Sequence, residues 1–352
     1  MSATTGIEWT DATWNPVSGC TRVSSGCDRC YIERTPPFRM AGRRFDGAGI
    51  GGTTGVMLHP DRLSQPFRWR KPRRVFVCSL ADLFHDDVPE EYIARVWAVM
   101  GLAARHTFQV LTKRPARMRN LLASEGFRTE VEDALKGVVA AYSPERVWFE
   151  TWPLPNVWCG VTAESQKWAN RRIPILLDAP AAVRFVSAEP LIGEVWLGDA
   201  HLYRPALCPD GCGCKYPEDA DRRECACGGP CAEDRRPPDL QWLIAGGESG
   251  PRARPMHPQW VRSLRDQCTD AGVSFLYKQW GDWVPVAGAD DWRNRLESDH
   301  DVRVDGYHWP ISQPHGAEDG TEVMMRRVGK KAAGRELDGR TWDEFPRGVP
   351  DV

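Results

Sequence analysis

Three cysteines lie close together near the start of the chain. In WNPVSGCTRVSSGCDRCYIER (residues 14–34), six residues separate Cys20 from Cys27 and two separate Cys27 from Cys30. A zinc site would need a fourth Cys or His ligand, and the next histidine, His59, lies far along the chain. A redox Cys-x-x-Cys pair would leave Cys20 unused. We therefore favour a 4Fe–4S cluster held by three thiolates, which leaves one iron free to bind a small molecule.

Six further cysteines lie in a polar insert at residues 201–238 that is rich in proline and glycine. They are Cys208, Cys212, Cys214, Cys225, Cys227 and Cys231. A disulfide knot is disfavoured, because the chain shows no sign of export and cytosolic thiols stay reduced. One or two structural zinc ions would fold a segment that lacks its own apolar core. We favour zinc for the insert, with an auxiliary iron–sulfur cluster as the alternative.

Polar and glycine residues recur at the point where each short apolar run of the chain ends. They include Asp82 and His85, Lys113 and Arg114, Glu164, Ser187 and Glu189, and Gly246, Gly247, Glu248 and Ser249. Each residue alone has a simpler explanation as a solvated or salt-bridged strand end, and an aspartate here can also cap a helix. Their recurrence after successive runs indicates a shared pocket.

The spacing of apolar residues predicts the elements that position these groups. Compact apolar runs occur at 74–80, 107–111, 157–161, 182–187, 242–245 and 274–277, and amphipathic helical stretches separate them. This alternation predicts an α/β fold with parallel strands and crossover helices. Polar groups after the strand ends are typical of the functional face of a TIM-like parallel (β/α) barrel, partial or full. A doubly wound open sheet is the alternative.

Composition and charge narrow the class of protein. The barrel is expected over residues 1–280, interrupted by the insert at 201–238, and the loop-rich residues 281–352 are expected to form an irregular C-terminal cap. No run approaches the roughly 18 apolar residues of a membrane span. The N-terminus lacks the basic start and apolar core of a signal peptide. We therefore expect a cytoplasmic protein with no membrane partner, and its net charge of −2 argues against extensive binding of polyanions.

The cysteine motif and several other stretches carry a resemblance to known families. A three-cysteine loop after a first strand-like segment resembles the radical S-adenosylmethionine (radical SAM) superfamily. More closely, WTDATWNPVSGCTRVSSGCDRCY (9–31) resembles an uncharacterised family encoded by phages and prophages and described as radical-SAM-like. Further similar stretches are FVCSLADLFHDDVP (76–89), FQVLTKRP (108–115), RFVSAEPLIG (184–193), LIAGGESGPRARP (243–255), LYKQWGDW (276–283) and RELDGRTWDEFP (335–346).

The resemblance implies a cofactor and a reaction. The open iron would bind S-adenosylmethionine, and one electron from the cluster would break the C5′–S bond and release a 5′-deoxyadenosyl radical. Glu248 and Ser249 are then expected to meet the amino group or ribose of the cofactor. The other residues expected to hold the cofactor are Gly246, Gly247, Glu164, Ser187 and Glu189. Asp82, His85, Lys113 and Arg114 are expected to contact the substrate.

A basic stretch suggests what the substrate could be. RWRKPRR (68–74), which contains Arg70 and Lys71, places five cations beside a tryptophan. Cations next to an aromatic ring suit phosphate contact and base stacking, although a solvated basic loop has the same composition. With the resemblance to phage-encoded proteins, a nucleobase in phage DNA becomes the expected target, and an electron donor becomes a required partner. The alternative is a non-catalytic iron–sulfur and zinc metalloprotein that binds nucleic acid.

Overall fold

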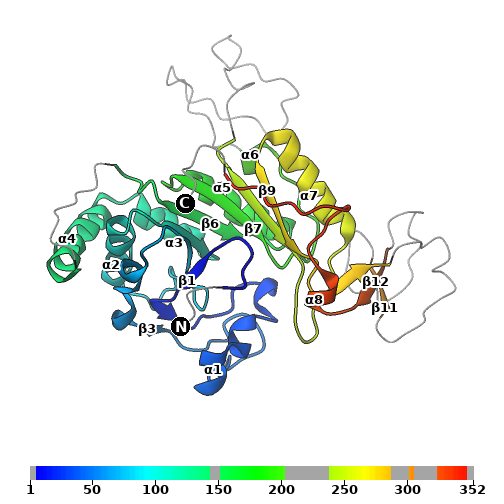
Figure 1. Cartoon of the computed structure of the whole chain (residues 1–352), viewed down its shortest axis with the longest axis horizontal. Helices are drawn as coiled ribbons and strands as arrows, with labels where there is room; N and C mark the ends of the chain where they lie inside the picture. Colours follow the sequence, from blue (N-terminus) through cyan, green and yellow to red (C-terminus); the bar gives the residue numbers. More distant parts are fainter. Residues whose placement is uncertain (1–4, 143–150, 203–237, 287–300, 305–322, 347–352) are drawn as a thin grey trace, which may run out of the picture.

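The computed structural model describes residues 5–142, 151–202, 238–286, 301–304 and 323–346. Its centre is a sheet of seven parallel strands (Figure 1). The strands are β1 (Ala12–Trp14), β4 (Arg74–Val77), β5 (Thr107–Thr112), β6 (Val157–Thr162), β7 (Val183–Ala188), β8 (Trp242–Gly246) and β9 (Ser274–Gln279). Most of their residues are buried, as expected for parallel strands that are covered on both faces. Each of the six apolar runs forms one of these strands.

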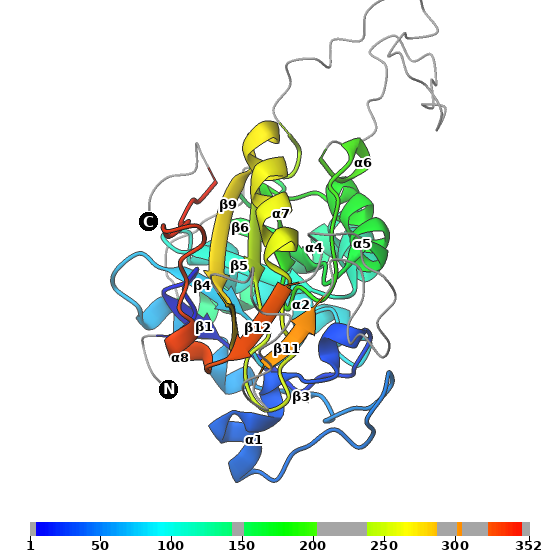
Figure 2. The ribbon, with the colours of Figure 1, turned by 90° about the vertical axis from the view of Figure 1, so that its right-hand side faces the viewer.

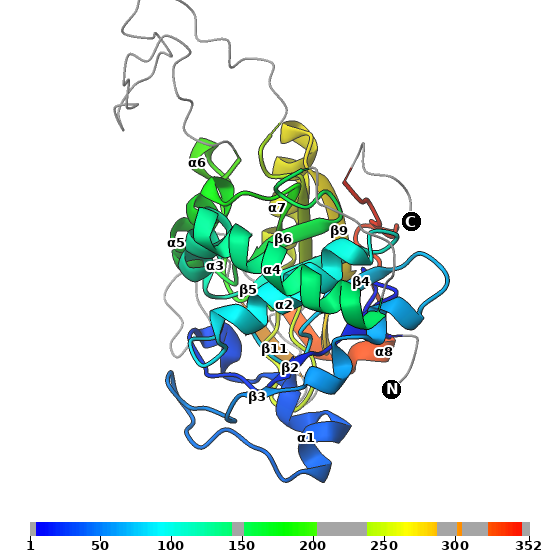
Figure 3. The ribbon, with the colours of Figure 1, turned by 90° about the vertical axis from the view of Figure 1, so that its left-hand side faces the viewer.

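The strands follow one another in the sheet in the same order as in the chain. Each crossover therefore moves one position in the same direction, and the sheet curls into a half-barrel (Figures 1 and 3). A doubly wound sheet would instead reverse its direction near the middle. The predicted α/β class is confirmed. The sheet is compatible with a partial TIM-like fold, because no ladder joins β9 to β1 in the described part of the chain.

Helices follow most of the strands. They are α2 (Glu90–Leu102), α3 (Pro115–Leu122), α4 (Glu125–Tyr142), α5 (Gln166–Asp178), α6 (Asp199–Leu202) and α7 (Pro258–Ala271). In α2, Glu90 and Glu91 occupy the first turn, where negative charge is favourable, and Ile93 and Val96 belong to the buried face. Gly272 ends α7 with a φ of 72°, a conformation that favours glycine.

Aromatic side chains fill the interior of the half-barrel. This interior cluster contains Trp9, Phe76, Trp158, Val183, Phe185, Trp242, Ile244 and Leu276. The Trp242 ring lies 5.6 Å from that of Phe185 and 5.8 Å from that of Trp158, measured between centroids. Gly160 in β6 leaves room for Phe185, because a Cβ at this position would collide with the Phe185 ring. The interior is therefore a packed core below the carboxyl ends of the strands.

The C-terminal segment lies along the free edge of β9. The amide of Tyr277 in β9 donates to the carbonyl of Trp342 at 2.9 Å. Phe345 packs against the interior cluster, with its ring centroid 5.1 Å from that of Trp242, and the guanidinium of Arg74 lies 4.1 Å from the same Phe345 ring. Since Arg74 begins β4 at the opposite side of the half-barrel, residues 342–346 span the gap that the seven strands leave open.

Smaller elements complete the described chain. Near the N-terminus these are β2 (Val17–Ser18), β3 (Met57–Leu58), α1 (Pro36–Met40) and four 3₁₀ turns, at Ser25–Cys27, Tyr31–Arg34, Pro60–Arg62 and Gln65–Arg68. After β9 they are β10 (Trp283–Pro285), β11 (Asp301–Val304), β12 (Val323–Arg327) and α8 (Lys330–Ala333). Strands β10, β12 and β11 form an antiparallel sheet beside α7 (Figure 2).

Two predictions fall partly or wholly outside the described residues. The expected cap at 281–352 is described only in part, and its described part includes the small antiparallel sheet. The six cysteines of the insert all lie outside the described residues, so their zinc or auxiliary cluster stays a prediction. None of the described helices is long and apolar enough to cross a membrane.

Candidate functional site

A cavity of about 450 Å³ lies at the carboxyl ends of the parallel strands. Cys20, Cys27 and Cys30 line it, together with residues at or just after the carboxyl ends of β4, β5, β6, β7, β8 and β9. Of the other residues singled out in the sequence, the lining contains Asp82, Lys113, Arg114, Ser187, Glu189, Gly247, Glu248 and Ser249. The volume is typical of pockets that hold small molecules and cofactors.

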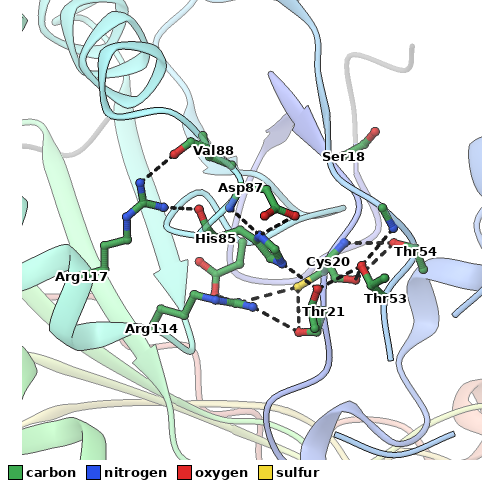
Figure 4. Close-up of polar contacts among 12 residues, drawn as sticks. Ser18, Cys20, Thr21, Thr53, Thr54, His85, Asp87, Val88, Arg114 and Arg117 are labelled. Atoms are coloured by element: carbon green, nitrogen blue, oxygen red, sulfur yellow. Dashed lines mark hydrogen bonds and ion pairs between the residues drawn. The ribbon is translucent and has the colours of Figure 1, made fainter. Parts of the chain in front are cut away.

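The cysteine loop, residues 19–30, is held in place at both of its glycines. Gly19 has a φ of 98°, and a Cβ there would collide with the carbonyl oxygen of Gly55. The amide of Cys20 donates to Thr54 Oγ1 at 3.0 Å (Figure 4). A Cβ on Gly26 would collide with the Glu164 side chain. The glycine before each of the first two cysteines therefore permits close packing of the loop against its neighbours.

Burial raises the pKa of two of the thiols in the loop, those of Cys20 and Cys30. Burial raises the pKa of Cys20 to about 12, with the negative charge of Asp82 adding to this effect and Arg114 opposing it. Burial likewise raises the pKa of Cys30 to about 11. Arg114 Nη1 lies 4.0 Å from Cys20 Sγ (Figure 4). Because thiolates are the nucleophilic form, these thiols are weak nucleophiles but remain able to bind a metal that displaces their protons.

The three thiols share a cavity, but no site for a single ion is formed within the described residues. There, no group of three His, Cys, Asp or Glu side chains could hold one metal ion. Cys20, Cys27 and Cys30 all line the same cavity, so a group bound in it could contact each of them. A single zinc ion draws its sulfurs within about 4 Å of each other, whereas each thiolate of a 4Fe–4S cluster binds a different iron.

Asp82 orients the cations beside Cys20. Its carboxylate accepts hydrogen bonds from Thr112 Oγ1 at 2.7 Å, from the Lys113 amide at 3.0 Å and from Arg114 Nη1 at 3.1 Å. It also accepts from the amide of Phe84 at 3.0 Å. Since Asp82 is buried and its two oxygens share four donors, it fixes the loop after β5 and the guanidinium of Arg114.

His85 supports the cysteine loop from behind the cavity. Its Nε2 lies 2.7 Å from Thr21 Oγ1, and its Nδ1 accepts a hydrogen bond from the Asp87 amide at 3.1 Å (Figure 4). Arg117 donates to the His85 carbonyl. Burial lowers the pKa of His85, and the positive charge of Arg114 lowers it further. His85 is not part of the cavity lining and contacts the residue next to Cys20 instead.

Glu164 is the centre of a buried ion-pair network behind the loop. Its side chain is fully buried, pairs with Lys113, and lies 2.9 Å from Arg172. Ser24 Oγ donates to it at 2.7 Å. Burial raises the pKa of this carboxyl, but Lys113 and Arg172 lower it more, to about 2. Glu164 is also absent from the lining, so the structure places it between the cysteine loop and α5.

Glu248 ties the loop after β8 to the cysteine loop. Arg254 Nη2 lies 2.7 Å from its carboxylate, and Arg29 Nη1 lies 3.4 Å from it. Arg254 Nη2 also donates to the Ser25 carbonyl at 3.1 Å. Gly247 permits this arrangement, because a Cβ there would collide with the Trp280 carbonyl oxygen. The predicted Gly-Gly-Glu element thus lies at the cavity, with its carboxylate already engaged by two arginines.

Another part of the cavity wall carries a second set of polar groups. Glu189 and Lys278 form an ion pair with 3.0 Å between Oε1 and Nζ, and Ser187 lies beside them in the lining. Gly246 faces this pair rather than the lining, and a Cβ there would meet Glu189 Oε1 at 2.7 Å. Gln279 Oε1 is buried and has no hydrogen-bond partner among the described residues. This wall offers both charges and an unused acceptor to a ligand.

Four further residues line the cavity. Lys278 and Gln279 belong to the polar strand ends that the sequence pattern assigns to the functional face, and the structure places both in the lining, whereas sequence reasoning missed Trp9 and Cys78. Trp9 lines the cavity from below, although it precedes the first strand. Cys78, which lies in the apolar run 74–80, also lines the cavity just after β4, with a φ of 60° that is uncommon outside glycine. Burial raises its pKa strongly.

Two predicted substrate contacts lie elsewhere. Arg70 and Lys71 are exposed and precede β4, at the amino end of the sheet, whereas the cavity lies at the carboxyl end. The structure therefore does not bring them to the cysteine loop. The cations that it does bring there are Arg22, Arg29, Arg34, Lys113, Arg114, Lys278 and Lys330.

Comparisons with known proteins give one match. The family model described as a protein of unknown function (DUF5131) matches residues 4–346. No curated protein and no solved structure matches the chain. The match covers the cysteine loop, every strand of the half-barrel and the C-terminal segment that closes it.

Proposed function

The chain belongs to the DUF5131 family of proteins of unknown function, and we propose that it is an iron–sulfur enzyme of the radical SAM type. Cys20, Cys27 and Cys30 would hold a 4Fe–4S cluster, and S-adenosylmethionine would bind at the iron without a protein ligand. The main support is the placement of three thiols from one short loop on a cavity of cofactor size, with cations beside them.

The residues of the chain would prepare the site for this chemistry. When bound, the cluster supplies one electron that splits the C5′–S bond of S-adenosylmethionine into methionine and a 5′-deoxyadenosyl radical. The protein must fix the thiols, balance their charge and exclude water. Arg114 and Lys113 bring positive charge to the thiol side, and Asp82 and Glu164 hold these cations in place.

The polar groups around Glu189 and Lys278 would hold the cofactor. S-adenosylmethionine carries a carboxylate, an ammonium and a sulfonium, and Glu189 and Lys278 offer charges of both signs. Ser187 and Gln279 add a hydroxyl and an amide for ribose hydroxyls. Trp9 supplies an apolar surface for the adenine. Glu248 would anchor the cysteine loop through Arg254, a role different from the direct amino-group contact that the sequence suggested.

The first prediction tests the cluster and the reaction together. Protein reconstituted anaerobically with iron and sulfide should become brown, and should form 5′-deoxyadenosine and methionine when dithionite and S-adenosylmethionine are added. Replacing Cys20, Cys27 and Cys30 with alanine should abolish 5′-deoxyadenosine formation and the colour that comes from this cluster, because the cluster needs these thiolates. The matched control is Cys268→Ala, which removes a buried thiol of α7 that lies away from the cavity.

Two outcomes would separate the proposal from its alternative. Iron content unchanged in the triple variant would reject the ligand assignment. A full cluster that yields no 5′-deoxyadenosine, with or without added nucleic acid, would favour the non-catalytic metalloprotein instead. The assay requires neither the nucleobase target nor the natural electron donor, and both remain predictions.

A further inference from the structure

A second hollow, of about 440 Å³, adjoins the cavity at the cysteine loop. We call it the arginine hollow, because Arg22, Arg29 and Arg252 line it together with Phe45, Asp28 and Asp46. Arg22, Arg29 and Phe45 also line the larger cavity, so the two spaces are contiguous. A molecule held in the arginine hollow would therefore extend toward the three thiols.

Arg22 is held rigidly at the junction between the two spaces. Its side chain is buried, and its Nη1 donates to the Gly47 carbonyl at 2.7 Å. The guanidinium lies 4.1 Å from the centre of the Phe45 ring. Its Nε is buried and has no hydrogen-bond partner among the described residues. This cation is therefore fixed by packing and a carbonyl, and no carboxylate neutralises it in the described part of the chain.

The other two arginines leave most of their donors unused. Arg29 reaches Glu248 only through one long contact of 3.4 Å, and Arg254 already binds the same carboxylate more closely. Arg252 is exposed and forms no ion pair with any residue that the structure describes. Since a guanidinium has five N–H donors, the arginine hollow has a large surplus of them.

The two carboxylates of the arginine hollow offset only part of these charges, because three arginines face two aspartates. Asp46 accepts a hydrogen bond from the Thr53 amide at 2.7 Å, within its own loop. Asp28 Oδ2 lies 3.9 Å from Arg254 Nη1, and Arg254 is the arginine that pairs with Glu248. The hollow thus keeps an excess of positive charge.

We propose that the arginine hollow binds a phosphate group of the substrate. Three guanidiniums from two separate loops offer more donors than a single carboxylate group of a ligand can accept. A phosphate monoester carries up to two charges and three terminal oxygens, so it can accept more of these hydrogen bonds. The contiguous cavity then receives the rest of the phosphate-bearing molecule. The identification of this molecule as the substrate rests on the proposed function. The binding of phosphate in the arginine hollow does not depend on it.

Calorimetry on the reconstituted full-length protein tests the site, with thymidine 5′-monophosphate, thymidine and inorganic phosphate as probes. Thymidine 5′-monophosphate should bind at least about tenfold more tightly than thymidine, because only the monophosphate can use the arginines. Arg252→Ala should weaken it by about tenfold or more, the effect of losing one charge-assisted contact. Arg44→Ala is the matched control, because Arg44 is an exposed arginine next to Phe45 in the chain but does not line the hollow.

A single-stranded oligonucleotide distinguishes the source of the phosphate. Tighter binding of the oligonucleotide than of the monophosphate, lost in Arg252→Ala, would identify a nucleic-acid backbone, and the reverse order would identify a free nucleotide. Equal affinities for thymidine and its monophosphate, or an Arg252→Ala variant that binds like wild type, would overturn the phosphate site. Phosphate binding without cleavage of S-adenosylmethionine would overturn only the proposed reaction.

Discussion

Three buried carboxylates around the cavity, Asp82, Glu164 and Glu248, each accept hydrogen bonds from arginine or lysine side chains. Residue types and strand ends predict that these carboxylates lie near the site. Residue types and strand ends cannot predict that the carboxylates pair with protein cations, because the partner arginines and lysines come from distant positions in the sequence. Glu164, for example, pairs with Lys113, which lies 51 residues earlier in the chain.

Glu164 carries a prediction about stability and pH. Glu164→Gln should lower the free energy of unfolding by about 3–5 kcal/mol near pH 7, because it leaves Lys113 and Arg172 without their buried partner. The pKa of Glu164 is about 2 in the folded protein against an ordinary 4.5. Its ionised form therefore stabilises the fold above about pH 4.5, and this contribution declines as the pH falls toward 2.

Denaturant unfolding at several pH values measures this effect. The difference between wild type and Glu164→Gln should narrow steadily below about pH 4.5. Glu132→Gln serves as the control, because Glu132 pairs with Arg128 on the surface and such pairs contribute about 0–1 kcal/mol. A difference between wild type and Glu164→Gln that stays constant down to pH 2.5 would show that the charge of Glu164 does not stabilise the fold.

At the scale of elements, the cysteine loop depends on glycine for its position. Gly26→Ala should reduce the iron bound per chain, because the new Cβ collides with Glu164, a side chain that its ion pairs hold in place. Iron content after reconstitution and the absorbance near 400 nm measure the loss. Gly137→Ala is the control: it lies in α4 with nothing within 4 Å of its Cβ, and should stabilise the helix by up to about 1 kcal/mol. Full iron occupancy in Gly26→Ala would refute this role of the glycine.

The strands and main helices could be predicted from the sequence because their signals are local. Continuous apolar runs such as 157–161 and helical spacing such as that of Ile93 and Val96 lie within a few residues of each other. The closure of the half-barrel could not be predicted, because it depends on hydrogen bonds between β9 and residues 342–346 that apolar periodicity does not encode. Likewise, nothing in the local pattern places Trp9 beneath a cavity or Cys78 in its wall.

At the scale of the molecule, the half-barrel is completed by the end of the chain. A chain that stops at Gly334 should unfold at a lower temperature, with a loss of about 3 kcal/mol or more, because Phe345 leaves the interior cluster and the edge of β9 loses its partner. Thermal unfolding and binding of a hydrophobic dye measure the effect. A chain that stops at Pro346 is the control and should behave like wild type. Equal melting temperatures for the two truncations would show that residues 335–346 contribute nothing to the core.

Arg254 pairs with Glu248 and also donates a hydrogen bond to the Ser25 carbonyl. This contact has a consequence for the timing of assembly. Ser25 and Arg254 are 229 residues apart. At a synthesis rate of about 5–20 residues per second, roughly 10–45 s pass between the appearance of the cysteines and that of the arginine that fixes them. During that interval the nascent cysteine loop has no anchor from the β8 side. Under the proposed function, insertion of iron and sulfide into a fixed site would therefore be a late event, which follows the synthesis of nearly the whole half-barrel.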